Sequence, residues 1–256
     1  MKKNILLIGS TGSIGKNLAI YLSQNHDYKL IIADKKSSGL VDLSKKLNID
    51  FEHINLTDKE NIQESITNIC EYFNNDIYGF IFNAAQTTEG LMSKYNKMPD
   101  FDKFPLDVWY EGIQINLSSF FQICQIISPI MSKKGCGKII AVSSMYGVVA
   151  PTPKLYQNLN FHTPAVYTAS KSGLIGLIKW LASYLGENNI NVNSISPGGV
   201  FNDQDEDFVK RLESKIPLKR MAKKDDINGI VSYLLSEESN YANGHNFIID
   251  GGYTIR

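Results

Sequence analysis

Short apolar runs alternate along this chain with segments whose apolar residues recur every three or four positions. Residues 5–8 and 30–33 are two such runs, each of a length typical of a strand buried on both faces. Strands of this kind form parallel sheets, and the helices that connect them cover both faces of the sheet. The alternation predicts one doubly wound α/β domain over residues 1–256, with a seven-stranded and mostly parallel sheet.

The apolar pattern also predicts where the elements lie. The expected strands cover residues 5–8, 30–33, 51–56, 79–82, 138–142, 190–195 and 246–249. One helix is expected directly after the first strand, and the others cover residues 39–47, 58–73, 106–131, 165–186 and 225–235. No linker, shift in composition or internal repeat divides the chain, which favours a single domain.

A glycine-rich turn joins the first expected strand to the first helix. Its glycines are Gly9, Gly12 and Gly15, a GxxGxxG spacing rather than GxGxxG. Glycines in such a turn let the backbone approach a pyrophosphate, while the helix N-terminus offers free N–H groups. The turn predicts a dinucleotide site, with a purely structural strand-to-helix turn as the alternative.

Asp34 ends the second expected strand, about 20 residues beyond the glycines, where a carboxylate can accept hydrogen bonds from the adenosine ribose hydroxyls. A carboxylate at this place repels a 2′-phosphate, so we expect NAD to be preferred over NADP. Lys35 and Lys36 follow directly, and a cation there could compensate. The alternative for Asp34 is an ordinary solvated turn residue.

Tyr167 and Lys171 are four residues apart on the expected helix 165–186, and therefore lie on one face of it. A phenol titrates near pH ~10, which is too high for a base at neutral pH, and a nearby ammonium lowers that pKa. The pair is thus a candidate proton-transfer group. Because a YxxxK match is expected about once by chance in a chain of this composition, its weight depends on the surrounding motifs.

Taken together, the motifs resemble the short-chain dehydrogenase/reductase family, from Ile5 to Gly252. In chain order they are Gly9/Gly12/Gly15, Asn83-Ala84-Ala85, Asn116, Ser143-Ser144, Tyr167/Lys171, Pro197-Gly198 and Asp250-Gly251-Gly252. The resemblance implies a Rossmann fold. It also implies an enzyme that transfers hydride between NAD(P) and a secondary alcohol or ketone.

The resemblance also implies a role for individual residues. Tyr167 would be the general acid/base, and Lys171 would lower its pKa and hold the nicotinamide ribose. Ser144, the second serine of its pair, would hydrogen-bond the substrate oxygen, and Asn116 would anchor a water that links the lysine to solvent. Besides Tyr167 and Lys171, the expected cofactor contacts are Gly9, Ser10, Thr11, Ser13, Ile14, Gly15, Asp34, Asn55, Leu56, Asn83, Ala84, Ala85, Pro197, Gly198 and Val200.

Four positions depart from the family pattern. Ser13 stands where the common spacing has glycine, and Asn55 where many members have an aspartate that contacts adenine. Gln86 replaces the last glycine of the NNAG-like turn, and Asn202 stands roughly where a threonine often contacts the carboxamide. These departures put individual cofactor contacts in doubt and leave the catalytic residues in place.

Tyr167 lies 23 positions after Ser144, a longer gap than the family usually shows. The insert 145–164 is rich in proline and aromatic residues, so we expect an ordered wall of the substrate site, with a subunit contact as the alternative. The loop 86–104 is a second expected wall. The segment 201–212 is short and charged, which favours a polar substrate.

The SSMYGVVAP run and the long insert are similar to a subgroup of these enzymes from bacterial surface-sugar and flagellin-glycan pathways. We therefore expect a sugar-like substrate. Three alternatives remain: a reductase of a non-sugar carbonyl such as a 3-oxoacyl group, a non-catalytic NAD-binding regulator, and an epimerase or dehydratase that retains NAD. The resemblance also implies a homo-oligomer, a dimer or tetramer, paired through helices 106–131 and 165–186.

The composition indicates the compartment and excludes some partners. The 26 basic and 26 acidic residues balance, so nothing favours nucleic acid or an anionic membrane as a partner. Cys70, Cys124 and Cys136 lack metal-site spacing, as do the histidines, and no metal is expected. No apolar run approaches the ~20 residues of a membrane span. The chain also enters its first strand without a signal-peptide pattern, so we expect a soluble cytoplasmic protein.

Overall fold

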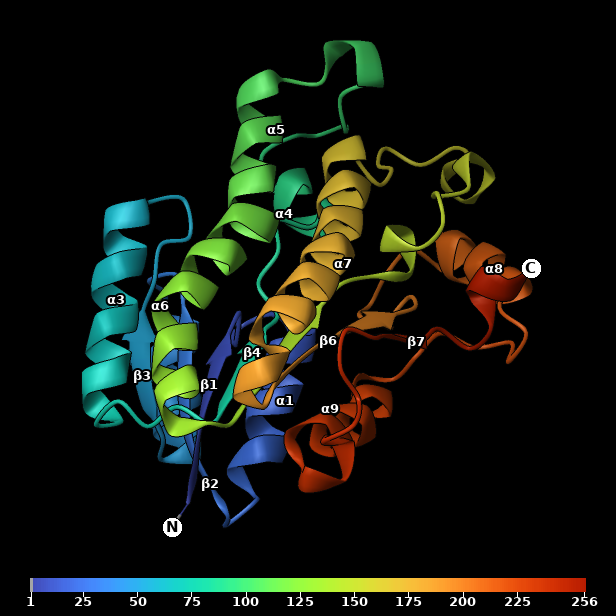
Figure 1. The fold of residues 1–256 in the computed structure, drawn as a ribbon. Helices are drawn as coiled ribbons and strands as arrows, with labels where there is room; N and C mark the ends of the chain where they lie inside the picture. Colours follow the sequence, from blue (N-terminus) through green and yellow to red (C-terminus); the bar gives the residue numbers. More distant parts are fainter. Residues whose placement is uncertain (1) are drawn as a thin grey trace.

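The computed structural model describes residues 2–256, so Met1, where the predicted domain begins, lies outside the described residues. The strands form one seven-stranded sheet in the order β3-β2-β1-β4-β5-β6-β7 (Figure 1). Every neighbouring pair is parallel, so the predicted doubly wound α/β fold is confirmed and the sheet is parallel throughout. The strands are β1 Lys3–Ile8, β2 Tyr28–Asp34, β3 Asp50–His53, β4 Gly79–Phe82, β5 Gly137–Val142, β6 Ile190–Pro197 and β7 Asn246–Ile249.

The third strand is shorter than predicted. The apolar pattern extended it to Leu56, but β3 lies at the edge of the sheet and ends at His53, because its neighbour β2 ends at Asp34, which pairs with His53. One further backbone bond runs from the Ile54 N–H to the Asp34 carbonyl at 2.9 Å. Beyond it, Ile54 and Leu56 are buried by packing rather than by strand pairing. Buried apolar residues after a strand are therefore easily mistaken for more strand.

Helices connect the strands and also include two that the apolar pattern does not predict. They are α1 Ser13–Ser23, α2 Ser38–Leu47, α3 Lys59–Tyr72, α4 Thr88–Met92, α5 Leu106–Ile113, α6 Ser119–Lys134, α7 Ala165–Leu185, α8 Glu206–Lys215 and α9 Asn228–Leu235. The unpredicted helices are α4, which has five residues, and α8, in which Leu212 is the one buried residue. The five residues of α4 are too few to show an apolar stripe, whereas α8 carries one, Phe208, Val209 and Leu212, within a predominantly charged segment.

The predicted single helix 106–131 is interrupted. Gln114–Ser118 forms a π-helical turn between α5 and α6, marked by a bond from the Ser119 N–H to the Gln114 carbonyl. The helix then continues through Pro129 to Lys134, where Gly135 ends it with φ +74°. A π turn displaces the following side chains around the helix axis, and such turns are frequent at functional sites.

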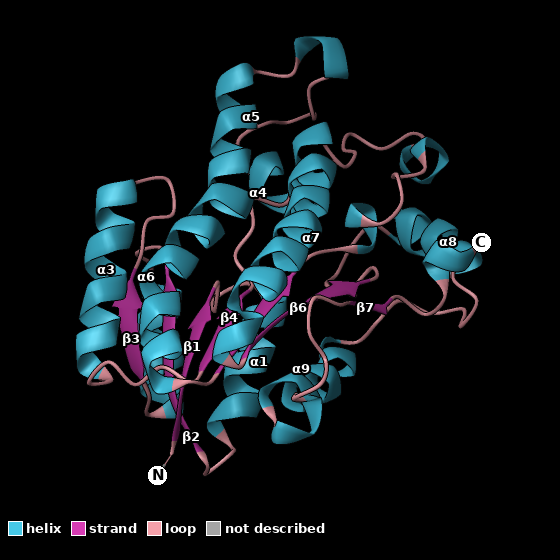
Figure 2. Cartoon of the chain, in the orientation of Figure 1, coloured by secondary structure: helices cyan, strands magenta, loops and turns pink. Residues whose placement is uncertain are grey.

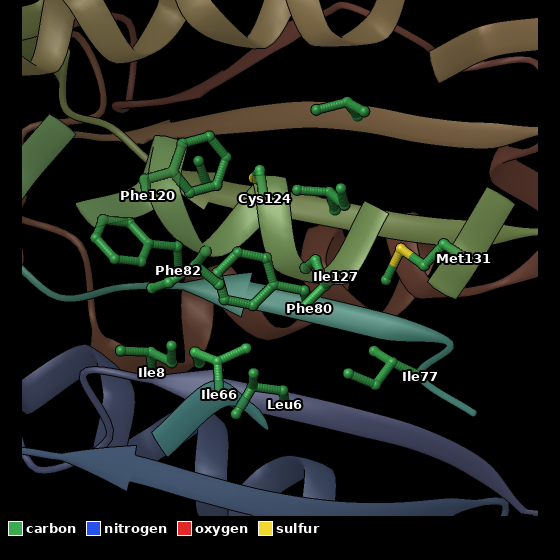
Figure 3. Packing of buried hydrophobic residues seen from close by; sticks show 14 of the residues in the cluster. Leu6, Ile8, Ile66, Ile77, Phe80, Phe82, Phe120, Cys124, Ile127 and Met131 are labelled. Carbon is green, nitrogen blue, oxygen red and sulfur yellow. The ribbon is translucent and has the colours of Figure 1, made fainter. Parts of the chain in front are cut away.

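The two faces of the sheet carry separate apolar cores. Leu6 and Ile8 of β1 point toward α3, α6 and α7, whereas Ile5 and Leu7 point toward α1, α2 and α9. Figure 3 shows the first core, in which the Phe80 and Phe120 rings stack with centroids 5.9 Å apart. Burial of apolar area on both faces accounts for the continuous apolar strands in the sequence.

Long connections leave the carboxyl ends of the strands. Figure 2 shows that the chain enters β1 at the amino ends of the strands, while the loops around α4 and the insert 145–164 rise from the carboxyl ends. Ligands of open α/β sheets bind outside the carboxyl ends, where the strand order reverses, here between β1 and β4. Among residues 2–256, no helix is both long and apolar enough to cross a membrane.

Candidate active site

The turn after β1 is packed tightly against the turn after β4. Gly9 has φ +83°, and a Cβ at this position would lie 2.3 Å from the backbone nitrogen of Ala84. A Cβ at Gly15 would lie 1.9 Å from the Gly9 carbonyl oxygen. The Asn83 side-chain amide donates to that same oxygen at 2.8 Å. Gly9 and Gly15 are therefore required for the close approach of the two turns.

Asp34 holds the glycine-rich turn against the end of β2. Its Oδ2 accepts hydrogen bonds from the Thr11 backbone N–H and hydroxyl, each at 2.8 Å. Its Oδ1 accepts from the Lys35 backbone N–H at 2.8 Å. The carboxylate is thus half-buried at the place where the sequence predicts ribose recognition, although it is also part of the turn's own structure.

Two serines that follow β5 have different surroundings. The Ser143 hydroxyl donates to the Lys171 carbonyl at 2.9 Å and therefore ties β5 to α7. The Ser144 hydroxyl accepts from the Tyr146 N–H at 3.1 Å. It keeps its proton available for another acceptor, as the predicted contact with a substrate oxygen requires.

Asn116 lies in the π turn and is fully buried. Its Oδ1 accepts from the Gln86 N–H at 2.7 Å, and its Nδ2 donates to the Ser170 hydroxyl at 2.9 Å. The Ser170 hydroxyl in turn donates to the Tyr167 carbonyl at 3.0 Å. One side chain thus joins the β4 turn, the helix of the π turn and α7.

Tyr167 and Lys171 lie one turn apart at the start of α7, as their spacing predicts. The Lys171 ammonium lies 5.7 Å from the centroid of the Tyr167 ring. Among residues 2–256 it donates one hydrogen bond, to the Val142 carbonyl at 2.7 Å, and the residue is 1% exposed. Lys171 is therefore fixed at the carboxyl end of β5, beside Ser143 and Ser144.

Comparison with family models decides the family. The model described as Enoyl-(Acyl carrier protein) reductase matches residues 8–254, nearly the whole chain. The chain belongs to the short-chain dehydrogenase/reductase family. It is a short-chain NAD(P)-dependent dehydrogenase/reductase that acts on a CH–OH group. Its substrate class within the family does not follow from this match.

Individual relatives differ in the activities that their names describe. The chain is 28% identical to the 3-oxoacyl-[acyl-carrier-protein] reductase of Thermotoga maritima, over 99% of this chain and 98% of that protein. It is also 28% identical to post-translational flagellin modification protein A of Campylobacter coli, with the same coverage. A short-chain dehydrogenase of Leptospira borgpetersenii, solved with bound NAD+, is 30% identical with a TM-score of 0.83. This comparison covers 99% of this chain and 93% of that one.

The start of α1 in this short-chain dehydrogenase/reductase fits the pyrophosphate of NAD(P). The first N–H groups of a helix have no intrahelical partner, and Gly12, which caps α1, adds no side-chain hydrogen bond. A Cβ at Gly12 would have one neighbour within 4 Å, the Gly9 carbonyl oxygen at 3.9 Å. The Ser13 hydroxyl is buried and has no hydrogen-bond partner among residues 2–256. Open space beside an unsatisfied donor fits a phosphate group.

The pKa values of Tyr167 and Lys171 are both shifted by desolvation. Burial raises the pKa of Tyr167 to about 12, although the hydroxyl of Ser144 opposes the rise. Burial also lowers the pKa of Lys171 to about 7. Desolvation therefore dominates both pKa values in this geometry, and the lowering of the phenol pKa by Lys171 stays a prediction. Both groups are desolvated, and the ammonium donates to a carbonyl instead of the phenol.

The remaining predicted contacts divide between exposed and buried positions. Asn55 is exposed, and its Oδ1 accepts from the Thr57 hydroxyl at 2.8 Å, whereas Leu56 is buried. Gly198 follows β6, and a Cβ there would lie 2.8 Å from the Cα of Asp250. Val200, two residues further on, forms an isolated parallel bridge. These residues lie at the carboxyl ends of β3 and β6, as the sequence predicts.

Other predicted cofactor positions also lie at the carboxyl edge. Ser10 is buried and donates to the Ala33 carbonyl at 3.3 Å, and Ile14 lies in the first turn of α1. Ala85 follows the tightly packed Ala84, and Pro197 is the last residue of β6. Within residues 2–256, no group of His, Cys, Asp and Glu side chains is arranged to hold a metal ion.

Sequence reasoning missed two residues of the site. Ser170 links Asn116 to the backbone of Tyr167, and its position three residues after Tyr167 on the same helix was the available signal. Gln86 appears in the sequence as a departure from the family pattern. Its backbone N–H bonds to Asn116, and its buried Oε1 has no partner among the described residues.

Proposed function

We propose that this enzyme transfers hydride between NAD and a secondary alcohol or ketone of a small, polar, sugar-like molecule, as a cytoplasmic homo-oligomer. The arrangement at the carboxyl end of β5 carries this proposal. There Ser144, Tyr167 and Lys171 come together, and Asn116 bonds to the same helix. A hydroxyl, a phenol and an ammonium beside one another are what proton exchange with a substrate oxygen requires.

Each catalytic residue has a role that its surroundings support. The Tyr167 phenol exchanges the proton of the substrate hydroxyl, and the Ser144 hydroxyl donates to the same substrate oxygen. Lys171 supplies positive charge at the phenol and holds a ribose hydroxyl, and Asn116 fixes the π turn so that a water can reach the lysine. The nicotinamide, when bound, accepts or delivers the hydride. Burial raises the pKa of Tyr167 to about 12. For the phenolate to form at neutral pH, additional positive charge close to the phenol would have to lower this pKa.

The cofactor would lie along the carboxyl edge, with its pyrophosphate at α1. The residues proposed to hold it are the predicted set: Gly9, Ser10, Thr11, Ser13, Ile14, Gly15, Asp34, Asn55, Leu56, Asn83, Ala84, Ala85, Tyr167, Lys171, Pro197, Gly198 and Val200. The Asp34 carboxylate supports NAD over NADP, since it would repel a 2′-phosphate. The bound NAD+ of the Leptospira relative agrees with this preference.

Two observations support a sugar-like substrate. The flagellin modification protein of Campylobacter coli is similar over nearly its whole length. In addition, the segment 201–212 is short and charged, which favours a polar substrate over an acyl chain. A 3-oxoacyl substrate is the second candidate, because the Thermotoga maritima reductase is equally similar at 28% identity.

A homo-oligomer is supported by aromatic side chains left exposed on the long helices. Trp180 and Tyr184 of α7 are 56% and 67% exposed, and their rings stack with centroids 5.0 Å apart. Tyr110 of α5 and Phe121 of α6 are also exposed. Light scattering on the wild type and on a Trp180→Glu variant tests the pairing. A monomeric wild type would contradict it.

The test of the proposed function is the absorbance change of NADH or NADPH with panels of sugars, nucleotide sugars and 3-oxoacyl thioesters. We expect NAD-dependent oxidation of a member of the sugar panels, or NADH-dependent reduction of its keto form, and a loss of about 10²- to 10⁴-fold in Tyr167→Phe with NADH binding retained. Turnover of 3-oxoacyl thioesters alone would favour the second candidate. Bound NADH without turnover of any compound would favour a non-catalytic regulator, and NAD that co-purifies tightly would favour an epimerase or dehydratase.

A further inference from the structure

The insert 145–164 and α8 are separated in the sequence but pack together through three aromatic rings. Tyr156 stacks on Phe208 of α8, with ring centroids 5.6 Å apart and planes at 30°. Phe161 meets the edge of Phe208 at 5.7 Å and that of Tyr156 at 5.9 Å. In Figure 1 the yellow-green insert lies beside the orange α8. Stacked and edge-to-face pairs contribute beyond simple burial, so the two segments hold each other.

Arg211 adds a polar connection between the same two segments. Its guanidinium, which extends from α8, donates to the backbone carbonyls of Leu155 and Gln157 in the insert. The nearest acidic group is Asp207, at 3.9 Å on the same helix. Arginine presents its donors in a rigid fork, so a single side chain can hold two carbonyls at once.

The opposite side of the insert is bonded to the loop 86–104. The Met98 N–H donates to the Asn160 carbonyl at 2.8 Å, and the Asn160 side chain donates back to the Asn96 carbonyl at 3.0 Å. The His162 ring lies 3.2 Å from the Pro99 carbonyl oxygen. The insert, itself one expected wall of the substrate site, is therefore bonded both to the other expected wall, the loop 86–104, and to α8.

The inner side of this assembly faces the catalytic tyrosine. Tyr167 packs against a buried cluster that includes Tyr146 of the insert and Leu212 of α8, and Tyr156 and Phe208 pack against the same cluster. Within the cluster, the Tyr156 hydroxyl donates to the Tyr146 hydroxyl at 3.0 Å and lies 2.7 Å from the Thr163 hydroxyl. A shift of α8 away from the insert would thus open space next to the reacting groups.

We propose that Phe208 and Arg211 clamp α8 onto the insert before any substrate binds, and that this clamp limits the size of the substrate. The inference rests on the proposed function for its second part only. In this proposal the assembled wall favours a compact polyhydroxylated molecule over one with a long arm at the reacting carbon. Phe208 and Arg211 are positioning residues in this proposal, since they act through the insert.

Hydrogen exchange on the full-length protein tests the clamp without any substrate. Arg211→Gln removes the guanidinium. Lys210→Gln is the matched control, because Lys210 is exposed on the same helix and, within residues 2–256, pairs only with Glu206. We expect amide exchange in residues 153–161 and 206–215 to accelerate about tenfold or more in Arg211→Gln, with the strands and Lys210→Gln unchanged. Equal protection in both variants would overturn the clamp.

Substrate selectivity tests the size limit. Wild type, Arg211→Gln and Phe208→Leu are compared on short and long ketones that share one reacting group, and the readout is the ratio of kcat/KM for long over short. We expect both variants to raise this ratio about tenfold while NADH binding stays constant. An unchanged ratio in a variant whose α8 exchanges faster would overturn the size limit. If the wild type turns over neither a ketone nor a sugar, the proposed function fails, and the exchange result still decides the clamp.

Discussion

The Asn116 side-chain amide lies 2.9 Å from the Ser170 hydroxyl, across the junction of the π turn and α7. Replacing Asn116 with leucine should cost about 2–5 kcal/mol of unfolding free energy. The reason is that the Gln86 N–H and the Ser170 hydroxyl would each lose a buried partner. Urea unfolding measures the loss, with Ser170→Ala as the comparison that removes only one contact. A loss in Asn116→Leu no greater than that in Ser170→Ala would contradict this reading.

Two glycines of one turn should respond differently to replacement by alanine: one variant should lose stability and the other should lose affinity for NADH. Gly9→Ala should destabilise the fold by about 2 kcal/mol or more, since the residue has positive φ and its Cβ would overlap the backbone of Ala84. Gly12→Ala has room and should unfold like the wild type, but its methyl group should weaken NADH binding. Thermal unfolding and a fluorescence titration with NADH separate the two effects. Unaltered NADH affinity in Gly12→Ala would place the pyrophosphate elsewhere.

Asp34 should set the choice of cofactor. Asp34→Asn keeps an oxygen that can accept from Thr11 and removes the charge that repels a 2′-phosphate. We expect the ratio of the Kd for NADPH to the Kd for NADH to fall about tenfold, which corresponds to ~1.4 kcal/mol. Titration of both cofactors into both proteins measures the ratio. The same ratio in both proteins would show that Asp34 serves only the turn.

Lys171 should make stability depend on pH. Its folded pKa of about 7 lies below the ordinary value of 10.5, so between these values the unfolded chain binds a proton that the folded chain does not. Stability should therefore rise with pH above about 7, by up to ~1.4 kcal/mol per pH unit from this group. The rise should end near pH 10, where tyrosines of the unfolded chain ionise.

The variant Lys171→Met removes this contribution, and urea unfolding at a series of pH values compares its slope with that of the wild type. Lys138→Met provides a second case away from the catalytic residues. Burial lowers the pKa of Lys138 to about 8, and its ammonium donates to neutral oxygens of Asn191, Ser239 and Asn240. Parallel pH profiles for the wild type and Lys171→Met would show that the lysine stays charged when folded.

The strands and the catalytic edge were predictable because their signals are local. For example, β5 is buried at every position, and the apolar run 139–142 in the sequence indicates this burial. The π turn was not predictable, since it accompanies bonds from Asn116 to Gln86 and Ser170, which are distant in the chain. The helix α8 was missed for a similar reason. Its apolar stripe of Phe208, Val209 and Leu212 lies in a charged segment, and Phe208 and Arg211 connect the helix to a segment about 50 residues away.

The low pKa of Lys171 was also beyond the sequence. Spacing places Lys171 beside Tyr167, but only the folded protein shows that the ammonium is fully desolvated and directed at the Val142 carbonyl. The third strand was overestimated because Ile54 and Leu56 are buried without pairing. Local patterns report burial well, whereas hydrogen-bond partners depend on the whole fold.

Because the insert is bonded on both of its sides, segments near the substrate site cannot be exchanged independently between homologous proteins. The insert 145–164 contacts residues 94–99 on one side and α8 on the other. Its backbone groups and aromatic rings are bonded to or packed against these two neighbours. A chimaera that receives α8 alone from a relative with no arginine at the position of Arg211 would leave the Leu155 and Gln157 carbonyls without their donor. In this protein the three segments form a single module for recombination, and substrate preference should transfer between homologues only when all three are moved together.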